Sequence, residues 1–290
     1  MGLSVIIPVY NEEKSVKNTI VELHSILNKI KYEIIVVNDC SEDNTLDVLK
    51  NFNNIKLIEH QKNKGYGASI KTGIKESQYK IIAITDADGT YPNKNLPNFY
   101  NLLKSENLDM VVGSRTGDNV NIPLIRKPAK WFIGKLANYI VDTKIPDINS
   151  GLRVFKKASF LQFIKIIPDG FSLTTTITLG MLSGGFNIKF LDIDYFKRSG
   201  KSKIRPIRDT LNFFFLILKI GLYFAPLKVF LPISVFLITC SIFWGFYTML
   251  VLGKLADVSS LILIMTGFNI ATLAFVAELV NHRLPSSYYK

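Results

Sequence analysis

Two long uncharged runs near the C-terminus constrain this chain more than any other feature of its sequence. Residues 229–252 and 258–277 contain no Asp, Glu, Lys or Arg. As helices that rise about 1.5 Å per residue they would measure roughly 36 Å and 30 Å, enough to cross the hydrocarbon core of a bilayer. Two buried core helices are the alternative, but a soluble core rarely supplies two uncharged runs of this length. We therefore predict a transmembrane helical hairpin over residues 229–281.

Basic residues are distributed unevenly around the two runs. Eight Lys and Arg lie between residues 197 and 228, Arg283 and Lys290 follow the second run, and the turn at 253–257 carries one charge of each sign. By the positive-inside bias, both ends of the hairpin face the cytoplasm. The apolar run at residues 4–8 is too short for a signal peptide and lacks a basic flank. We expect an integral membrane protein whose N-terminal domain lies on the cytoplasmic face.

The formal net charge of +12 requires anionic partners. With a membrane tail in the same chain, lipid headgroups and phosphorylated substrates are better candidates than nucleic acid. The two cysteines, Cys40 and Cys240, lie in different regions, and the three histidines are scattered. We therefore predict neither a disulfide framework nor a zinc site.

Residues 1–208 have the mixed composition of a folded α/β domain. Short β-rich runs at 3–7, 33–37, 55–59, 81–85 and 109–113 alternate with helical patterns at 15–28, 45–52 and 67–77. This alternation predicts a mostly parallel sheet covered by helices. Ligands of such sheets bind beyond the carboxyl ends of the strands.

A juxtamembrane segment at residues 209–228 joins this domain to the hairpin. Its apolar part, residues 211–226, is interrupted by Lys219 and ends at Pro226. We interpret it as an amphipathic segment on the membrane surface. A third span is the alternative, because the segment is almost long enough to cross a bilayer. Residues 282–290 would form a short cytoplasmic tail.

The pair Asp86 and Asp88 directly follows the predicted strand at 81–85. Two carboxylates so close together repel each other unless a cation neutralises them. Their hard oxygen ligands suit Mg²⁺ or Mn²⁺, which would bridge to a substrate diphosphate. The alternative is an ordinary solvated acidic turn, because Asp-Gly and Tyr-Pro nearby also favour turns.

Other polar segments follow neighbouring strands at the same predicted edge. Residues 8–12 follow the first strand, and Asp39 follows the second. Asp39 could accept hydrogen bonds from a base or a ribose, or it could cap the next helix or turn. Residues 63–67 open a helix, and glycines there allow the backbone to approach a ligand closely. The glycine pattern is incomplete as a dinucleotide-binding fingerprint.

These segments together resemble a known family, the inverting glycosyltransferases of the GT-A fold. The closer resemblance is to dolichyl-phosphate mannose synthases and bacterial polyprenyl-phosphate glucosyltransferases, which have similar paired C-terminal spans. The matching motifs run in order through nearly the whole chain: Pro8-Val9-Tyr10-Asn11-Glu12, Val36-Val37-Asn38-Asp39, Asn63-x-Gly65-x-Gly67, Asp86-Ala87-Asp88, Val112-Gly113-Ser114-Arg115, Asp147-Ile148-Asn149-Ser150-Gly151-Leu152-Arg153, Gly170-Phe171-Ser172-Leu173-Thr174-Thr175-Thr176 and Gly200-Lys201-Ser202-Lys203-Ile204.

The resemblance implies a transferase that moves one hexose from a nucleotide-sugar to a polyisoprenyl phosphate, either dolichyl or undecaprenyl phosphate. It also implies a role for each matching position. Catalysis would involve Asp86, Asp88, Arg115 and Arg126. The nucleotide-sugar would be held by Pro8, Tyr10, Asn11, Glu12, Val37, Asp39, Gly65, Asp86, Ala87 and Asp88, and by Lys197, Arg198 and Lys203 of a cationic loop. The acceptor phosphate would be bound by Arg115, Arg126 and Lys130, and the metal by Asp86, Asp88 and Thr90.

Two positions depart from the family pattern. Thr90 stands where the mannose synthases commonly have a Gln that helps to hold the metal, and Lys130 stands where a Ser is often found. The register of the cationic loop is ambiguous, so either Lys197 or Arg198 takes the place of the family's arginine. The resemblance is compatible with UDP-glucose and with GDP-mannose as the donor. The segments 170–176 and 200–203 are more similar to the bacterial glucosyltransferases, which favours glucose. The sequence leaves open a homo-oligomer.

Two other functions are compatible with parts of this pattern. A processive polysaccharide synthase would carry a Gln-x-x-Arg-Trp segment, but Trp131 and Trp244 are preceded by Lys130 and Phe243. A non-catalytic scaffold or flippase component could keep a decayed transferase domain. The intact Asp39, Asp86, Asp88, Arg115 and Arg126 argue against decay.

Overall fold

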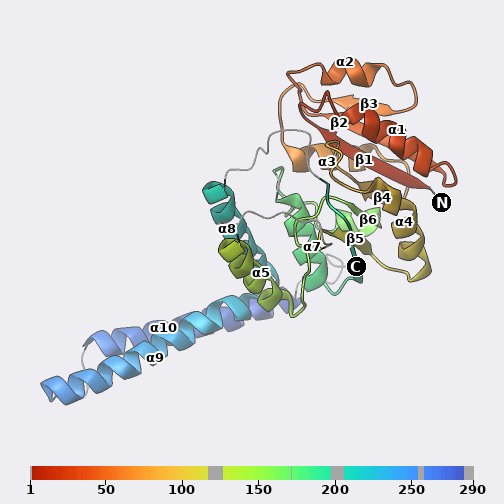
Figure 1. Cartoon of the computed structure of the whole chain (residues 1–290). Coiled ribbons are helices and arrows are strands. Elements are labelled where there is room, and N and C mark those ends of the chain that lie inside the picture. Colours follow the sequence, from red (N-terminus) through yellow and green to blue (C-terminus); the bar gives the residue numbers. More distant parts are fainter. Residues whose placement is uncertain (1, 117–126, 171, 197–205, 254–257, 284–290) are drawn as a thin grey trace.

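A seven-stranded mixed sheet forms the centre of the N-terminal domain in the described part of the chain (Figure 1). The computed structural model describes residues 2–116, 127–170, 172–196, 206–253 and 258–283. The strand order is β3-β2-β1-β4-β6-β5-β7, and β6 runs antiparallel to both of its neighbours while the other four pairings are parallel. The strands are β1 (Leu3–Val9), β2 (Tyr32–Asn38), β3 (Lys56–Glu59), β4 (Ile81–Ile84), β5 (Met110–Ser114), β6 (Arg153–Lys156) and β7 (Ile188–Asp192).

Helices cover both faces of this sheet because its central strands are apolar on both sides. Along β1, Leu3, Val5 and Ile7 belong to one buried cluster, and Ile6 belongs to the other. The first cluster includes residues of α1 (Val16–Ile26), α2 (Thr45–Lys50) and α4 (Leu96–Ser105), the last preceded by the 3-10 turn η1 (Asn93–Asn95). The second includes residues of α3 (Tyr66–Glu76), α6 (Lys157–Leu161) and α7 (Leu173–Ser183).

The strands and helices predicted between residues 3 and 113 are all present, with ends that differ by at most two residues. The mostly parallel α/β sheet is therefore confirmed. The antiparallel strand β6 between β4 and β5 was not predicted from the sequence.

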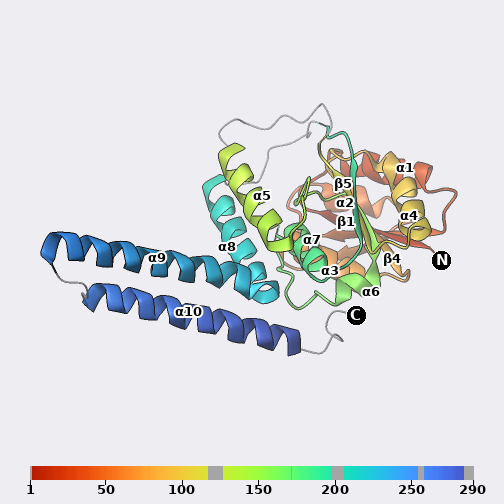
Figure 2. The same cartoon turned by 90° about the horizontal axis from the view of Figure 1, so that it is seen from below.

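The juxtamembrane segment forms most of α8 (Pro206–Phe224), which lies beside α5 (Lys127–Val141) (Figures 1 and 2). Ile217 and Ile220 of α8 are buried in a cluster with residues of α5 and α7. Phe215 and Leu222 are exposed. The helix is therefore apolar on a packed side and also on an exposed one. Its contact with a membrane surface stays a prediction.

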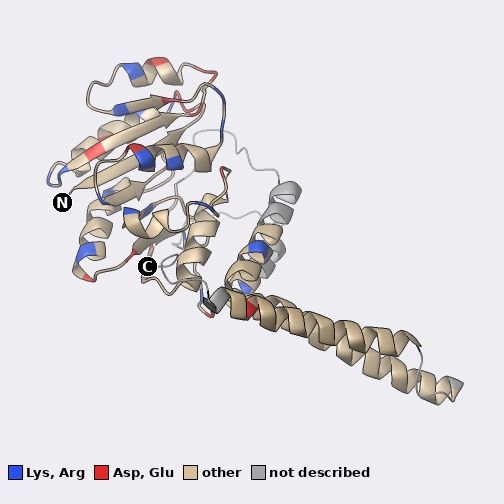
Figure 3. Ribbon diagram, turned by 180° about the vertical axis from the view of Figure 1, so that it is seen from behind, with Lys and Arg blue, Asp and Glu red and all other residues tan. Residues whose placement is uncertain are grey.

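The C-terminal runs form two long helices, α9 (Pro226–Leu252) and α10 (Val258–Arg283), which lie side by side and project away from the sheet domain (Figures 1 and 2). Figure 3 shows almost no charged residue along them. Of the described helices, these two are long and apolar enough to cross a membrane, and only 11% of each apolar stretch is buried. A core helix of a soluble protein would be mostly buried, so this exposure argues against the core-helix alternative and favours a bilayer.

A single residue joins the domain to the hairpin. The helix α8 ends at Phe224 and α9 begins at Pro226, with Ala225 between them. Proline is well tolerated in the first turn of a helix but not in the middle of one, which accounts for the break. The Nζ of Lys228 donates to the carbonyl oxygens of Tyr139 (3.3 Å) and Ile140 (3.0 Å) and pairs with Asp142, so the start of α9 is tied to the end of α5.

Candidate active site

A pocket opens at the sheet edge where β1, β2 and β4 end. Parallel strands bring their carboxyl ends to the same edge, so segments far apart in sequence meet there. The pocket wall is formed by Pro8, Val9, Tyr10, Glu12, Asp39, Asn63, Gly65, Tyr66, Ser69, Asp86, Ala87 and Asp88. The structure therefore brings together eight of the residues predicted to hold a nucleotide-sugar: Pro8, Tyr10, Glu12, Asp39, Gly65, Asp86, Ala87 and Asp88.

Hydrogen bonds hold both carboxylates of the acidic pair. The hydroxyl of Tyr66 donates to Asp86 Oδ1 (3.1 Å). The backbone N–H and the hydroxyl of Thr90 donate to Asp88 Oδ1 (3.1 and 2.6 Å). Burial, together with the charge of Asp86, raises the pKa of Tyr66 well above its ordinary value, so this hydroxyl remains a donor. Thr90 thus orients Asp88, and its own role as a metal ligand stays a prediction.

The acidic pair fits a divalent cation that is shared with a substrate. Among the residues that the structure describes, no group of three His, Cys, Asp or Glu could hold a metal by itself. Mg²⁺ typically takes one or two carboxylates and completes its octahedron with phosphate oxygens and water. Two carboxylates on the wall of one pocket suit that arrangement.

Asp39 is a buried carboxylate with three donors. It accepts hydrogen bonds from His60 Nδ1 (2.7 Å), from the N–H of Lys64 (2.9 Å) and from the N–H of Gly65 (2.7 Å). His60 is fixed from its other side by Thr72, at 3.0 Å from Nε2. Asp39 therefore shapes the turn that leads into α3, and its predicted contact with a nucleotide stays a prediction. The role of His60 was not predicted from the sequence.

The glycines at 65 and 67 make room for the chain itself. A Cβ on Gly65 would lie 2.7 Å from the carbonyl oxygen of Asp169, and one on Gly67 would lie 2.3 Å from that of Pro168. Gly65 also has a φ of +98°, a conformation that other residues rarely adopt. We predicted that these glycines let the backbone approach a ligand. The structure shows a close approach by the loop at 168–170, and the approach of a ligand to Gly65 stays a prediction.

Replacing Gly67 with alanine is expected to destabilise the domain by about 1–3 kcal/mol. The added Cβ would overlap the loop at 168–170, and neither this loop nor the start of α3 can move away without breaking contacts. The N–H of Ala68 donates to the Asp169 carbonyl (3.0 Å), so the loop at 168–170 would be displaced. Thermal unfolding of the purified protein measures this effect. Gly134→Ala in α5, where no described atom lies within 4 Å of the added Cβ, is the matched control and should not destabilise.

Asn11 and Val37 support the pocket from outside its wall. The N–H of Asn11 donates to Ser41 Oγ (3.0 Å), and its Oδ1 accepts from the N–H of Glu42 (2.8 Å). Val37 is buried in β2 opposite Pro8. These two residues therefore brace the segments that carry Tyr10 and Asp39.

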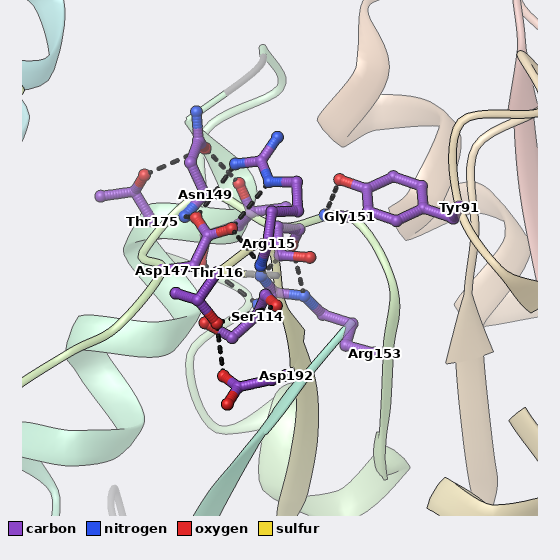
Figure 4. Close-up of polar contacts among 12 residues, drawn as sticks. Tyr91, Ser114, Arg115, Thr116, Asp147, Asn149, Gly151, Arg153, Thr175 and Asp192 are labelled. Atoms are coloured by element: carbon purple, nitrogen blue, oxygen red, sulfur yellow. Dashed lines mark hydrogen bonds and ion pairs between the residues drawn. The ribbon is translucent and has the colours of Figure 1, made fainter. Parts of the chain in front are cut away.

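Arg115 lies at the end of β5, where a fork of hydrogen bonds joins it to Asp147 (Figure 4). Its Nε and Nη2 donate to the two carboxylate oxygens at 2.7 and 3.0 Å. Its guanidinium also lies over the ring of Tyr195, 5.2 Å from the centroid. In the described part of the chain Nη1 has no hydrogen-bond partner, and 23% of the side chain is exposed.

Burial disfavours the charged forms of Arg115 and Asp147, but the hydrogen bonds and the attraction between them favour the charged forms more strongly. The pKa of Arg115 lies above its ordinary value because of Tyr91 and Asp147. The hydrogen bonds and the charge of Arg115 hold the pKa of Asp147 below its ordinary value of 3.8. Both groups are therefore charged at neutral pH.

The lowered pKa of Asp147 predicts an acid-sensitive contribution to stability. Because the folded pKa lies below the unfolded one, the contribution is complete above about pH 4 and is lost as the pH falls through the folded pKa. We expect the difference in melting temperature between the wild type and Asp147→Asn to shrink as the pH is lowered from about 4 to about 2. A difference that stays constant over this range would contradict the assignment.

Five of the predicted side chains are not described. Arg126, Lys197, Arg198 and Lys203 lie outside the described residues, and Lys130 is placed in α5 without a description of its side chain. Their predicted roles stay predictions.

Comparison with known proteins assigns the chain to a family. The model of glycosyl transferase family 2 matches residues 4–163, more than half of the chain. The chain belongs to glycosyl transferase family 2. A second model, the GtrB C-terminal hairpin, matches residues 225–282, which include most of α9 and α10. The chain is thus a glycosyltransferase, and its two long apolar C-terminal helices correspond to the hairpin of that second model, which supports membrane anchoring.

Individual relatives agree with this assignment. A dolichyl-phosphate hexose transferase of Haloferax volcanii is 26% identical over 205 residues, which cover 70% of this chain and 87% of the relative. A dolichol-phosphate mannosyltransferase of Pyrococcus furiosus is 27% identical over 220 residues, which cover 71% of this chain and 60% of the relative.

A solved structure shares the fold of this family 2 domain. Glucosyl-3-phosphoglycerate synthase from Mycobacterium tuberculosis, in complex with Mn²⁺, UDP and phosphoglyceric acid, aligns with a TM-score of 0.59 at 15% identity. The alignment covers 76% of this chain and 78% of the synthase. The expected GT-A type of α/β fold is therefore confirmed.

Proposed function

We propose that this glycosyltransferase moves a single hexose from a nucleotide-sugar to a polyisoprenyl phosphate at the cytoplasmic face of a membrane. The acceptor would be dolichyl or undecaprenyl phosphate, and the donor UDP-glucose or GDP-mannose. The observation that carries the proposal is a combination of features in one chain. The chain has a pocket with Asp86 and Asp88 on its wall, the Arg115–Asp147 ion pair, and two apolar C-terminal helices that match the GtrB hairpin. The two relatives above are named for transfer to dolichyl phosphate.

The donor would bind in the pocket at the carboxyl ends of β1, β2 and β4. Asp39 and the segment of Tyr10 to Glu12 would contact the nucleoside, and Asp86 and Asp88 would face the diphosphate through Mg²⁺ or Mn²⁺. A bound divalent cation would neutralise charge that develops on the leaving diphosphate. The Mn²⁺ and UDP in the mycobacterial synthase support a metal-dependent donor site of this type.

The nucleophile would be an oxygen of the lipid phosphate, which is already ionised. The site therefore needs cations that position this phosphate more than it needs a general base. The second pKa of a phosphate monoester is about 6, and the lipid phosphate is therefore mostly dianionic at neutral pH. Arg115, already oriented by Asp147 and Tyr195, would receive this phosphate through Nη1. Arg126 and Lys130 would add positive charge. An oxygen of the lipid phosphate would attack the anomeric carbon in line with the departing nucleotide and invert its configuration.

The experiment is transfer of radiolabelled sugar into an organic-extractable lipid. Purified protein is incubated with a polyprenyl phosphate, Mg²⁺ or Mn²⁺, and each donor of a UDP- and GDP-sugar panel. Label in the lipid phase from one donor would establish the reaction and identify the sugar. No label from any donor, with metal-dependent nucleotide binding intact, would overturn the proposed acceptor.

A further inference from the structure

One short loop runs from the Arg115–Asp147 pair to the hydroxyl of Tyr91 (Figure 4). At its start, Asp147 holds the guanidinium of Arg115. At its end, the N–H of Gly151 donates to the Tyr91 hydroxyl (2.7 Å), and a Cβ on Gly151 would lie 3.0 and 3.1 Å from the carboxylate oxygens of Asp86. Residues 147–151, hereafter the connector loop, therefore bind the proposed acceptor cation at one end and lie close to the proposed metal ligand at the other.

The connector loop is anchored by Arg153, the first residue of β6. Arg153 is completely buried. Its Nε donates to the carbonyl oxygen of Ser150 (3.2 Å), and Nη2 donates to the same oxygen. Its Nη1 reaches α7, where it donates to the Thr174 carbonyl (3.3 Å) and the Thr178 hydroxyl (3.2 Å). The guanidinium thus clamps the loop to the first turns of α7.

A second contact between the same two elements strengthens the clamp. The hydroxyls of Thr174 and Thr175 donate to Asn149 Oδ1 at 2.6 and 3.3 Å. The loop is therefore held to α7 at two successive residues, through the side chain of Asn149 and the backbone of Ser150. Its two ends, Asp147 and Gly151, have little freedom to move separately.

Burying Arg153 is costly, because in the described part of the chain its hydrogen bonds go to neutral groups and to no carboxylate. A buried cation without an ion pair carries a large desolvation penalty, and an apolar side chain of similar size would often be more stable there. Burial lowers the pKa of Arg153 to about 10, which still leaves it charged at neutral pH. Stability alone therefore does not account for an arginine at this position.

We propose that Arg153 is a positioning residue that, through the connector loop, sets the separation between Asp86 and Arg115. This inference rests on the proposed function, because that function assigns Asp86 to the donor and Arg115 to the acceptor. Loss of the clamp disturbs both ends of the loop together. Substitution of a residue that merely supports the fold would lower stability without changing the affinity for the nucleotide or the KM for the lipid acceptor.

The test compares Arg153→Met with Arg153→Lys and the wild type. Methionine fills most of the space without donating, and lysine keeps the charge but lacks the planar fork. The readouts are Mn²⁺-dependent binding of UDP or GDP, whichever the wild type binds, the KM for polyprenyl phosphate, and the melting temperature. For Arg153→Met we expect about tenfold weaker nucleotide binding and about tenfold higher acceptor KM, consistent with loss of a charged hydrogen-bond anchor. Lysine should restore part of each change.

Phe155→Leu is the matched control, since Phe155 is buried in the same strand and its ring stacks on Phe160 of α6. It should lower the melting temperature and leave both constants unchanged. The inference is overturned if Arg153→Met behaves like this control, with constants within twofold of the wild type. If the Met variant does not fold, the Lys variant decides by the same criterion.

The two proposals fail in different ways. A wild type that binds metal and nucleotide but transfers no sugar to lipid overturns the proposed function. The effect of Arg153→Met on nucleotide binding still tests the donor end of the clamp. Conversely, if the wild type transfers sugar to lipid and Arg153→Met has an unchanged nucleotide affinity and acceptor KM, only the inference about Arg153 is overturned.

Discussion

Asp88→Asn is expected to lower the rate of sugar transfer by about a thousandfold while the protein still folds. The substitution removes one negative charge from the proposed metal site with almost no change in volume. The Asn side chain keeps an oxygen that can accept from Thr90, which donates to Asp88 Oδ1 through its N–H and hydroxyl. Loss of about 4 kcal/mol of electrostatic stabilisation at the leaving diphosphate corresponds to about three orders of magnitude in rate.

The measurement is the initial rate of labelled lipid formation over a range of Mn²⁺ concentrations, together with the melting temperature. Asp47→Asn makes the same chemical change at an exposed carboxylate of α2 and should leave the rate unchanged. Wild-type turnover by Asp88→Asn would remove Asp88 from the metal site. A large fall in the melting temperature would instead assign Asp88 a structural role.

Arg115→Met is expected to have two separable effects, one on stability and one on acceptor binding. Asp147 has only 5% of its side chain exposed, so removal of its partner leaves a buried carboxylate uncompensated. Breaking a buried ion pair in this way typically costs about 3 kcal/mol or more. The KM for polyprenyl phosphate should rise about a hundredfold, because the charge-assisted contact between Nη1 and the phosphate is lost.

A double-mutant cycle separates the two effects. Asp147→Asn in the Arg115→Met background removes the stranded charge and should recover much of the lost stability. It should not recover the acceptor KM, because no cation returns to the site. If the double variant is no more stable than Arg115→Met, the ion pair contributes little. If the acceptor KM is unchanged in both variants, Arg115 does not bind the lipid phosphate.

Local sequence patterns were sufficient for the first half of the fold and failed at β6. The predicted strands up to residue 113 are apolar runs between turn-forming residues, and each forms where the pattern indicates. The strand β6 begins with the charged Arg153 and contains only two apolar residues before Lys156, so no such pattern marks it. The antiparallel direction of β6 depends on how the chain crosses the sheet. The alternation of strand-like and helix-like segments along the sequence does not specify that crossing.

The candidate site divides in the same way. Asp39, Asp86 and Asp88 directly follow predicted strands, and their position at one sheet edge follows from the parallel order. The pairs Arg115–Asp147 and His60–Asp39 join residues that are 32 and 21 positions apart. Asp147 precedes an antiparallel strand, so its arrival at the same edge could be recognised only once the direction of β6 was known.

In a membrane, the one-residue joint at Ala225, with Lys228 bound to the end of α5, would hold the catalytic domain at a fixed height above the bilayer. A hairpin that is longer or shorter than the hydrocarbon layer adjusts by tilting or by moving along the membrane normal. A flexible linker would absorb that adjustment. Here the adjustment would be transmitted to the domain and would change the depth at which the site meets lipid headgroups. We therefore expect the rate of catalysis to depend on bilayer thickness.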